Sequence, residues 1–205
     1  MLNAKQQFSD NWQFYIIGIV VLILIISGIV YFINMQKSQA LEAADLYSRG
    51  VIEYRQQNHP IAITTLTQVV ENYSGTESAN LATYLIGKIN YDSRNYPEAI
   101  RYFEMYLKLN TPDKINRAAS LAGIASAYEN QVMFAEAAEK FVAAYNENQD
   151  GPLVGDYLMA AMRNYLAAGD AVNASVYLDK IKELFEGTDL ATRSIRLYTE
   201  NTLNK

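Results

Sequence analysis

Few side chains in this sequence combine the types and spacing that catalysis or metal binding requires. Cysteine is absent, so there is no thiolate nucleophile, thiolate metal site or disulfide framework, and His59 is the only histidine. Glu136 and Glu139 lie one turn apart on a helical pattern, where paired carboxylates normally form a solvated face. Neither a glycine-rich phosphate loop nor a nucleophile paired with a base accompanies them. We therefore expect no enzyme activity, no cofactor and no metal site.

The amino-acid composition argues against a nucleic-acid partner. The chain has 205 residues, half of them hydrophobic, which is enough for one domain with a core. Its net charge is -5, and its 17 basic residues are scattered rather than clustered. A nucleic-acid-binding protein needs a concentrated basic surface, so we expect no nucleic-acid partner.

An uncharged apolar segment lies near the N-terminus. Residues 12–33, WQFYIIGIVVLILIISGIVYFI, contain no charged side chain. A helix of this length spans roughly 33 Å, enough for the hydrocarbon core of a bilayer, and aromatic residues at both ends favour the membrane interface. We expect the lipid bilayer to be a partner through these residues. The predicted division is a polar head at 1–11, a transmembrane helix at 12–34 and a linker at 35–39.

Two other interpretations of this segment are open. One is a buried core helix, which seldom lacks a polar face over such a length. The other is a cleaved signal peptide with Ser38-Gln39-Ala40 as the cleavage site, although the apolar run exceeds the usual length of such peptides. The positive-inside rule scarcely favours either orientation of the transmembrane helix. Lys5 and the amino terminus on one side balance Lys37 and Arg49 on the other.

The rest of the chain repeats one helical pattern. A small residue recurs in the same context at Ala62, Ala99, Ala137 and Ala174, with spacings of 37, 38 and 37 residues. A large apolar residue follows four positions later in each copy. Two antiparallel helices approach closely where both carry a small residue, so each copy predicts a helical hairpin, and we expect Gly87 to face Ala99. The residues expected to pack the repeats are Gly50, Ala62, Gly87, Ala99, Phe103, Ala125, Ala137, Phe141 and Ala174.

The hairpins define one all-α domain at 40–205. Turns are expected at Gln57-Asn58, Arg94-Asn95, Val132-Met133 and Gly169-Asp170. The last predicted helix has polar positions for an outer face, as the end of a stacked array requires. The repeats are expected at about 43–76, 80–113, 118–151 and 155–187, with a cap at 188–203.

The second copy resembles the tetratricopeptide repeat family. Residues 80–113, NLATYLIGKINYDSRNYPEAIRYFEMYLKLNTPD, align without gaps with that family's pattern, including Gly87, Tyr91, Ala99 and Phe103. The resemblance covers about residues 40–186. It implies a right-handed α-solenoid of about four hairpins and a capping helix, with a concave surface that binds proteins or unfolded peptide segments. Together with the apolar segment, the expected fold is all-α: a single N-terminal transmembrane helix followed by this solenoid.

The tetratricopeptide register implies which side chains line that surface. Tyrosine offers rigid contact area and a hydroxyl, while the basic residues can meet acidic groups. The alternative is that several tyrosines pack between adjacent first helices. The predicted groove residues are Tyr47, Tyr54, Arg55, Tyr84, Lys88, Tyr91 and Arg163.

The whole architecture resembles the ancillary subunit of the bacterial Sec translocon. That resemblance implies a single-pass protein of the bacterial inner membrane with its repeats in the periplasm, acting as an adaptor that assists secretion or recruits a chaperone near the translocon. Its partners would be a translocon, chaperone or client protein. Two alternatives are open: a structural or oligomerising component of an envelope complex, and a repeat receptor facing the cytosol.

Overall fold

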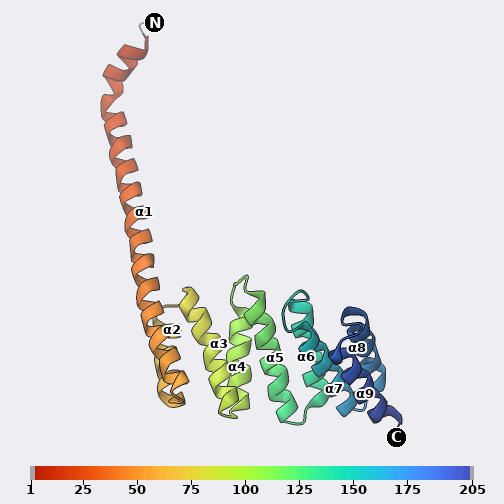
Figure 1. The fold of residues 1–205 in the computed structure, drawn as a ribbon. Coiled ribbons are helices and arrows are strands. Elements are labelled where there is room, and N and C mark those ends of the chain that lie inside the picture. The colour runs from red at the N-terminus through yellow and green to blue at the C-terminus, as the bar shows by residue number, and fades with distance from the viewer. Residues whose placement is uncertain (1–2, 204–205) are drawn as a thin grey trace.

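The computed structural model describes residues 3–203, which form nine α-helices joined by short connections, without a strand in that range (Figure 1). The helices are α1 (Asn3–Arg55), α2 (His59–Asn72), α3 (Glu77–Asp92), α4 (Tyr96–Lys108), α5 (Lys114–Asn130), α6 (Phe134–Glu147), α7 (Val154–Ala167), α8 (Ala171–Leu184) and α9 (Asp189–Leu203).

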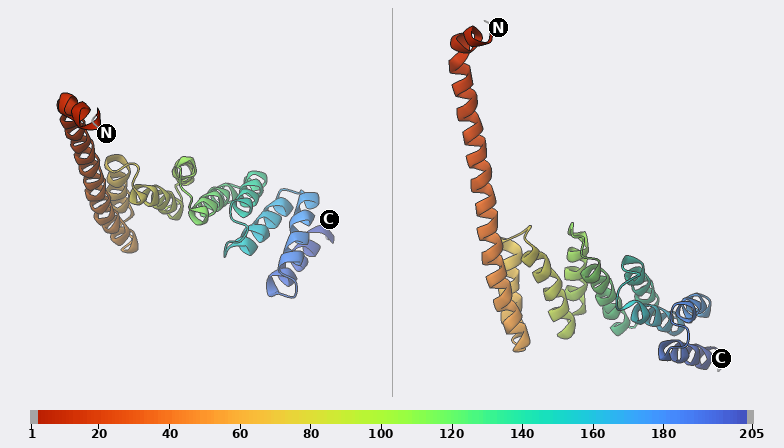
Figure 2. Two further views of the ribbon diagram at one scale, coloured as in Figure 1. Left: turned by 90° about the horizontal axis from the view of Figure 1, so that it is seen from above. Right: turned by 45° about the horizontal axis from the view of Figure 1, so that its top comes forward.

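The hairpins stack in a row that leads away from the lower part of α1 (Figures 1 and 2). Each hairpin packs on the next through its second helix, as α2 does on α3 and α4 on α5. The first helices α1 and α3, and α3 and α5, also lie in contact, whereas the second helices of successive hairpins do not. The first helices therefore line the inner, concave face of an all-helical solenoid.

Helix α1 differs from the prediction for the N-terminal part. The expected linker at 35–39 is wrong, because one unbroken helix runs through it from the apolar segment into the first hairpin. The physical reason is that residues 34–49 contain no glycine or proline and include several good helix formers. Ala43, which has no exposed surface, is the first buried residue along the described chain.

The four hairpin turns share one backbone conformation. In the first, Gln57 has a φ of 63°, and the backbone amide of Asn58 donates to the carbonyl of Glu53, which closes the helix in a Schellman motif. Arg94, Val132 and Gly169 occupy the same left-handed position in the next three turns. The turns predicted from the sequence are therefore found, and Pro60 and Pro97 lie in the first turn of the following helices.

The predicted packing residues are all buried. Gly87 lies directly against the ring of Phe103, since a Cβ added at Gly87 would lie 2.8 Å from that ring. Gly50 faces Leu66 in the same way. The large residue of the second helix therefore lies directly on the glycine of the first, because a missing side chain leaves room for the whole ring and not only for a close backbone approach.

The ring of Phe103 also bridges two hairpins. A Cβ added at Gly123 on α5 would lie 2.5 Å from its far edge, so the ring lies between two glycines of successive repeats. Phe103 is 3 % exposed and forms a small core cluster with Ala99 and Ile124. Two larger clusters flank it, one around α1–α3 and one around α5–α9.

Helix α9 closes the far end of the row. The Thr188 hydroxyl accepts a hydrogen bond from the backbone amide of Ala191, so Thr188 caps the N-terminus of the helix. Ala191 and Ser194 are buried against α7 and α8, whereas Thr192, Arg196 and Glu200 are exposed. The outer face of α9 is therefore mostly polar, as the end of a stack requires.

Val132 is expected to be strained in its turn. A β-branched residue in the left-handed region costs about 1–2 kcal/mol, and its side chain is exposed, so replacing it removes little packing. We expect Val132→Gly to raise the free energy of unfolding by about 1 kcal/mol, and Gly169→Val at the equivalent position to lower it by a similar amount. Urea denaturation of the full chain in detergent measures both; a destabilised Val132→Gly variant would contradict the strain.

Gly123→Ala is expected to destabilise the domain although alanine is the better helix former. The new methyl group collides with the buried Phe103 ring, and overpacking of this kind costs about 1–3 kcal/mol against a propensity gain of about 1 kcal/mol. Combining it with Phe103→Leu should cost less than the sum of the two single changes. Strict additivity in the unfolding free energies would show that the two residues do not share this space.

Candidate protein-binding groove

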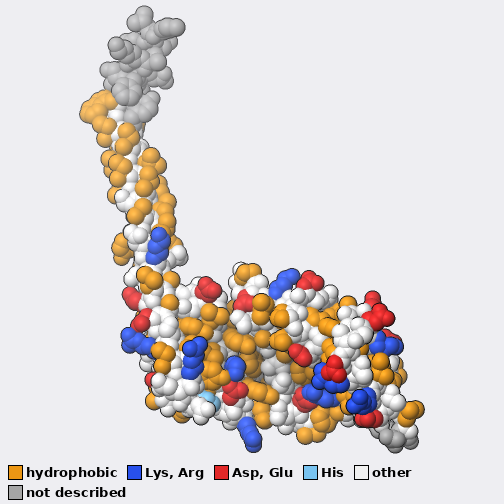
Figure 3. Space-filling view, viewed as in Figure 1, with side chains coloured by type: hydrophobic (Ala, Val, Ile, Leu, Met, Phe, Trp, Pro, Cys, Tyr) orange, Lys and Arg blue, Asp and Glu red, His pale blue; other side chains and the backbone are white. Residues whose placement is uncertain are grey.

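The concave face contains a pocket of about 270 Å³ between α3, α5 and the start of α7. Hydrophobic side chains gather in the middle of this face in the space-filling view (Figure 3). The pocket is lined by Tyr84, Lys88, Tyr91, Asp92, Phe103, Ala119, Ala122, Gly123, Ser126, Leu153 and Tyr157.

The pocket exists because the first helices separate at this point. Helices α1, α3 and α5 pack side by side, but α5 and α7 have at most marginal contact. The connection at 148–153 is the longest between hairpins and brings Leu153, which is 44 % exposed, to the rim. Small residues on α5, Ala119, Ala122 and Gly123, keep the floor open.

The pocket combines an apolar floor with four hydroxyl groups, of which that of Tyr91 is hydrogen-bonded to Asn130. The ring of Tyr84 packs against Phe103 and Tyr106 with centroid distances of 5.9 and 5.7 Å. Tyr157 is 7 % exposed, and burial and its neighbour Tyr84 raise its pKa. Within residues 3–203 no hydrogen bond is found for the hydroxyls of Tyr84, Tyr157 or Ser126, so all three are available to a ligand. Tyrosine hydroxyls above an apolar floor suit the backbone and side chain of a peptide.

Charged groups around the pocket are neutralised by one another. The Lys88 ammonium donates to the Tyr54 hydroxyl at 2.7 Å and pairs with Asp92 at 3.2 Å, while the Tyr54 hydroxyl donates to Asp92. Burial by itself lowers the pKa of Lys88, but hydrogen bonds with Tyr54 and Asp92 outweigh it and raise that pKa. Arg163 forms a two-pronged ion pair with Glu129 at the α5–α7 gap. The charges of Lys88 and Arg163 are therefore each paired with a carboxylate.

The same polar contacts tie the first helices together. Tyr54 links α1 to α3, the side-chain amide of Asn130 links α5 to α3 by donating to the Tyr91 hydroxyl at 3.1 Å, and Arg163 links α7 to α5. Each contact joins residues of successive repeats, so the predicted groove residues also hold the curvature of the concave face.

The predicted groove residues thus have different surroundings. Tyr84, Lys88 and Tyr91 line the pocket, and Tyr54 and Arg163 belong to the polar contacts around it. Tyr47 packs against the core around α1–α3, where burial raises its pKa. Arg55 lies apart, in an open hollow at the end of α1 beside His59.

Eight of the eleven lining residues are not among the predicted groove residues. Phe103 and Gly123 are hidden from a pattern search because their contact depends on how α4 lies against α5. Leu153 and Tyr157 reach the pocket from the start of α7, one or more positions away from the expected register. The aromatic character of Tyr157 is the only sequence signal that pointed to it.

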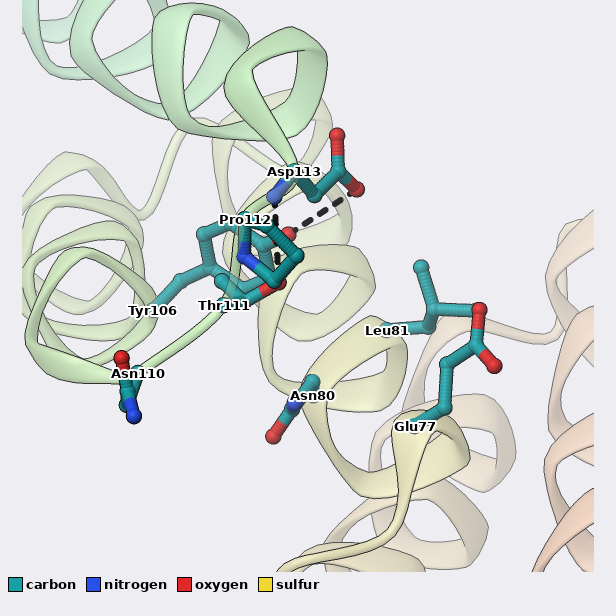
Figure 4. Close-up of a pocket in the computed structure, with 8 residues that line it drawn as sticks. All are labelled: Glu77, Asn80, Leu81, Tyr106, Asn110, Thr111, Pro112 and Asp113. Carbon is teal, nitrogen blue, oxygen red and sulfur yellow. Dashed lines mark hydrogen bonds between the residues drawn. The ribbon is translucent and has the colours of Figure 1, made fainter.

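A second hollow lies at the loop edge between the start of α3 and the α4–α5 connection (Figure 4). Its polar groups serve the local fold. The Asp113 side chain accepts from the backbone amide of Asn116 and from the Tyr106 hydroxyl. Burial opposes ionisation of Asp113, but these hydrogen bonds prevail and lower its pKa, while burial and the Asp113 charge raise the pKa of Tyr106 to about 12. The arrangement caps α5.

Three solved structures share this fold at low sequence identity. A tetratricopeptide repeat protein from Parabacteroides merdae is 16% identical, with a TM-score of 0.66, over 79% of this chain and 60% of that one, so the present chain spans less than two thirds of its length. YrrB, described as a TPR protein with an unusual peptide-binding site, is 19% identical over 75% of this chain and 74% of that one, with a TM-score of 0.56. The pilF protein of Pseudomonas aeruginosa is 19% identical over 75% and 66%, with a TM-score of 0.54.

The family model gives the assignment. No curated protein matches the sequence, but the model described as a tetratricopeptide repeat-like domain matches residues 5–153. That range is more than half of the chain and includes the first three hairpins. Repeats of this kind are typically scaffolds for protein–protein interaction and not enzymes. The chain belongs to the family of tetratricopeptide repeat-like proteins.

Proposed function

We propose that this protein is a membrane-anchored adaptor that binds a neutral, apolar segment of another protein in the groove of its repeat domain. The pocket carries the proposal: a floor built on Phe103, unpartnered hydroxyls at Tyr84 and Tyr157, and ion-paired charges at Lys88, Asp92 and Arg163. A peptide-binding site has been described for the similar fold of YrrB, which supports a peptide as the ligand class.

The anchor is inferred from the exposed surface of α1. Of the described residues, one helix is long and apolar enough to cross a membrane, and its most apolar window is not buried against the rest of the protein. Side chains from Ile16 to Ile33 are about half exposed or more, so water would surround an entire apolar helix. This argues against a buried core helix, and the cost of that exposure supports a bilayer as its surroundings.

The location follows from the architecture as an expectation. We place the anchor in a bacterial inner membrane with the repeats in the periplasm, close to a secretion site, where exiting chains and their chaperones present apolar segments. The proposed partners are a translocon, chaperone or unfolded client.

The first test asks whether the protein is anchored in the membrane and on which side the repeats lie. Full-length protein should stay in the membrane fraction after alkaline carbonate extraction, and its intact mass should include residues 1–40. Protease added to spheroplasts should digest the repeats. A mature chain that begins at Leu41 would show a signal peptide instead, and protected repeats would place the domain in the cytosol.

The groove is tested by photo-cross-linking in cells from a probe at position 84. Leu153→Asp should lower adduct formation about tenfold, because an apolar rim contact worth about 1.5 kcal/mol is replaced by a charge. Val172→Asp is the matched control, since Val172 is an exposed apolar side chain on α8 away from the pocket. Equal losses in both variants, or adducts only with a second copy of the chain, would overturn the groove assignment.

A further inference from the structure

Between the apolar segment and the repeats, α1 forms an exposed stalk. The continuous apolar run ends at Ile33, and the first buried residue is Ala43, so residues 34–42 lie between the apolar segment and the domain core. This stretch is mixed in polarity, with Lys37 and Glu42 beside exposed Met35 and Leu41, and it is exposed along its whole length. In Figure 1 the stalk is the lowest part of the length of α1 that extends above the hairpins.

The stalk is built to remain helical. It contains no glycine or proline, the Ser38 hydroxyl donates to Glu42, and Arg49 pairs with Asp45 one turn apart. Its lower end is clamped by the repeats, where the Tyr73 hydroxyl donates to Glu42 and Ala43 enters the core. With both ends held, the helix has no point at which the domain can hinge toward the bilayer.

The continuous helix therefore sets the distance between the hydrocarbon core of the bilayer and the groove. Tyr54, whose hydroxyl contacts Lys88 at the pocket, lies 21 residues beyond Ile33 on the same helix. At 1.5 Å per residue this separation is about 31 Å along the axis, and about 25–30 Å above the hydrocarbon if the helix tilts by an ordinary amount.

We propose that α1 acts as a rigid spacer, so that the groove binds segments of a neighbouring membrane-embedded chain only beyond a minimum distance from the bilayer. This rests on the proposed function. A fully extended chain covers about 3.4 Å per residue, so the minimum is about eight or nine residues outside the membrane. A flexible chain has the greatest effective concentration where its average reach matches the span, which is about thirty residues. The occupant is thus an unfolded stretch well outside the bilayer, not a juxtamembrane segment.

The experiment uses full-length protein in nanodiscs with a photo-cross-linker at position 84. A second component is a model transmembrane helix, followed by a Gly/Ser spacer of variable length and the neutral test segment Ser-Asn-Leu-Phe-Leu-Ser-Asn. Cross-linking should be absent with a spacer of about five residues, begin near nine and peak near thirty.

Two insertions after Ser38 separate a rigid spacer from a passive tether. Seven helix-forming residues add nearly two turns, which keeps the groove facing the same way and moves it about 10 Å outward. The minimum spacer should then rise by about three residues. Seven Gly/Ser residues at the same place should lower the minimum spacer length and make the onset of cross-linking less sharp. The reason is that the domain can then approach the bilayer.

The free test segment in solution tests the groove separately from the spacer. It should cross-link to all three proteins equally, since neither insertion changes the groove. Failure of the free segment to cross-link to the native chain would overturn the proposed function. Normal cross-linking of the free segment, together with the same minimum spacer in native and lengthened proteins, would overturn the spacer while leaving the groove intact.

Discussion

The ring of Phe103 lies between Gly87 on α3 and Gly123 on α5, and the middle of the solenoid depends on this contact. Two glycines permit one large ring to fill the space between successive hairpins, so that a single side chain of α4 sets the distance between two first helices. Packing at native density makes such a contact sensitive to a single methyl group. The same ring forms the floor of the pocket. Stability of the stack and shape of the groove therefore depend on the same side chain.

Polar contacts on the concave face add a second constraint. Tyr54 with Lys88 and Asp92, Asn130 with Tyr91, and Arg163 with Glu129 each join neighbouring repeats. Exposed pairs of this kind contribute little to stability, about 1 kcal/mol or less each. Their effect on recognition is larger, because charges that satisfy one another leave a neutral surface. The groove is consequently suited to an apolar segment and poorly suited to an acidic or basic tail.

The third constraint is the continuity of α1. An apolar helix with every face exposed is unfavourable in water and requires different surroundings. The same helix continues into the first half of the first hairpin. Whatever surrounds residues 16–33 is thereby joined to the groove without a flexible joint. The domain's position relative to that environment is a property of the fold, and no linker composition needs to be invoked.

The sequence by itself determined the helical class, the hairpin turns and the buried small residues, because these depend on local periodicity and on turn chemistry repeated four times. The tetratricopeptide register also put Tyr84, Lys88 and Tyr91 on one face of a helix, and these three residues line the pocket. Tertiary structure alone decided the rest. That Phe103 lies between Gly87 and Gly123, and that Leu153 and Tyr157 complete the pocket, depends on how neighbouring helices pack on one another. Those relations join residues far apart in the chain, and local sequence does not encode them.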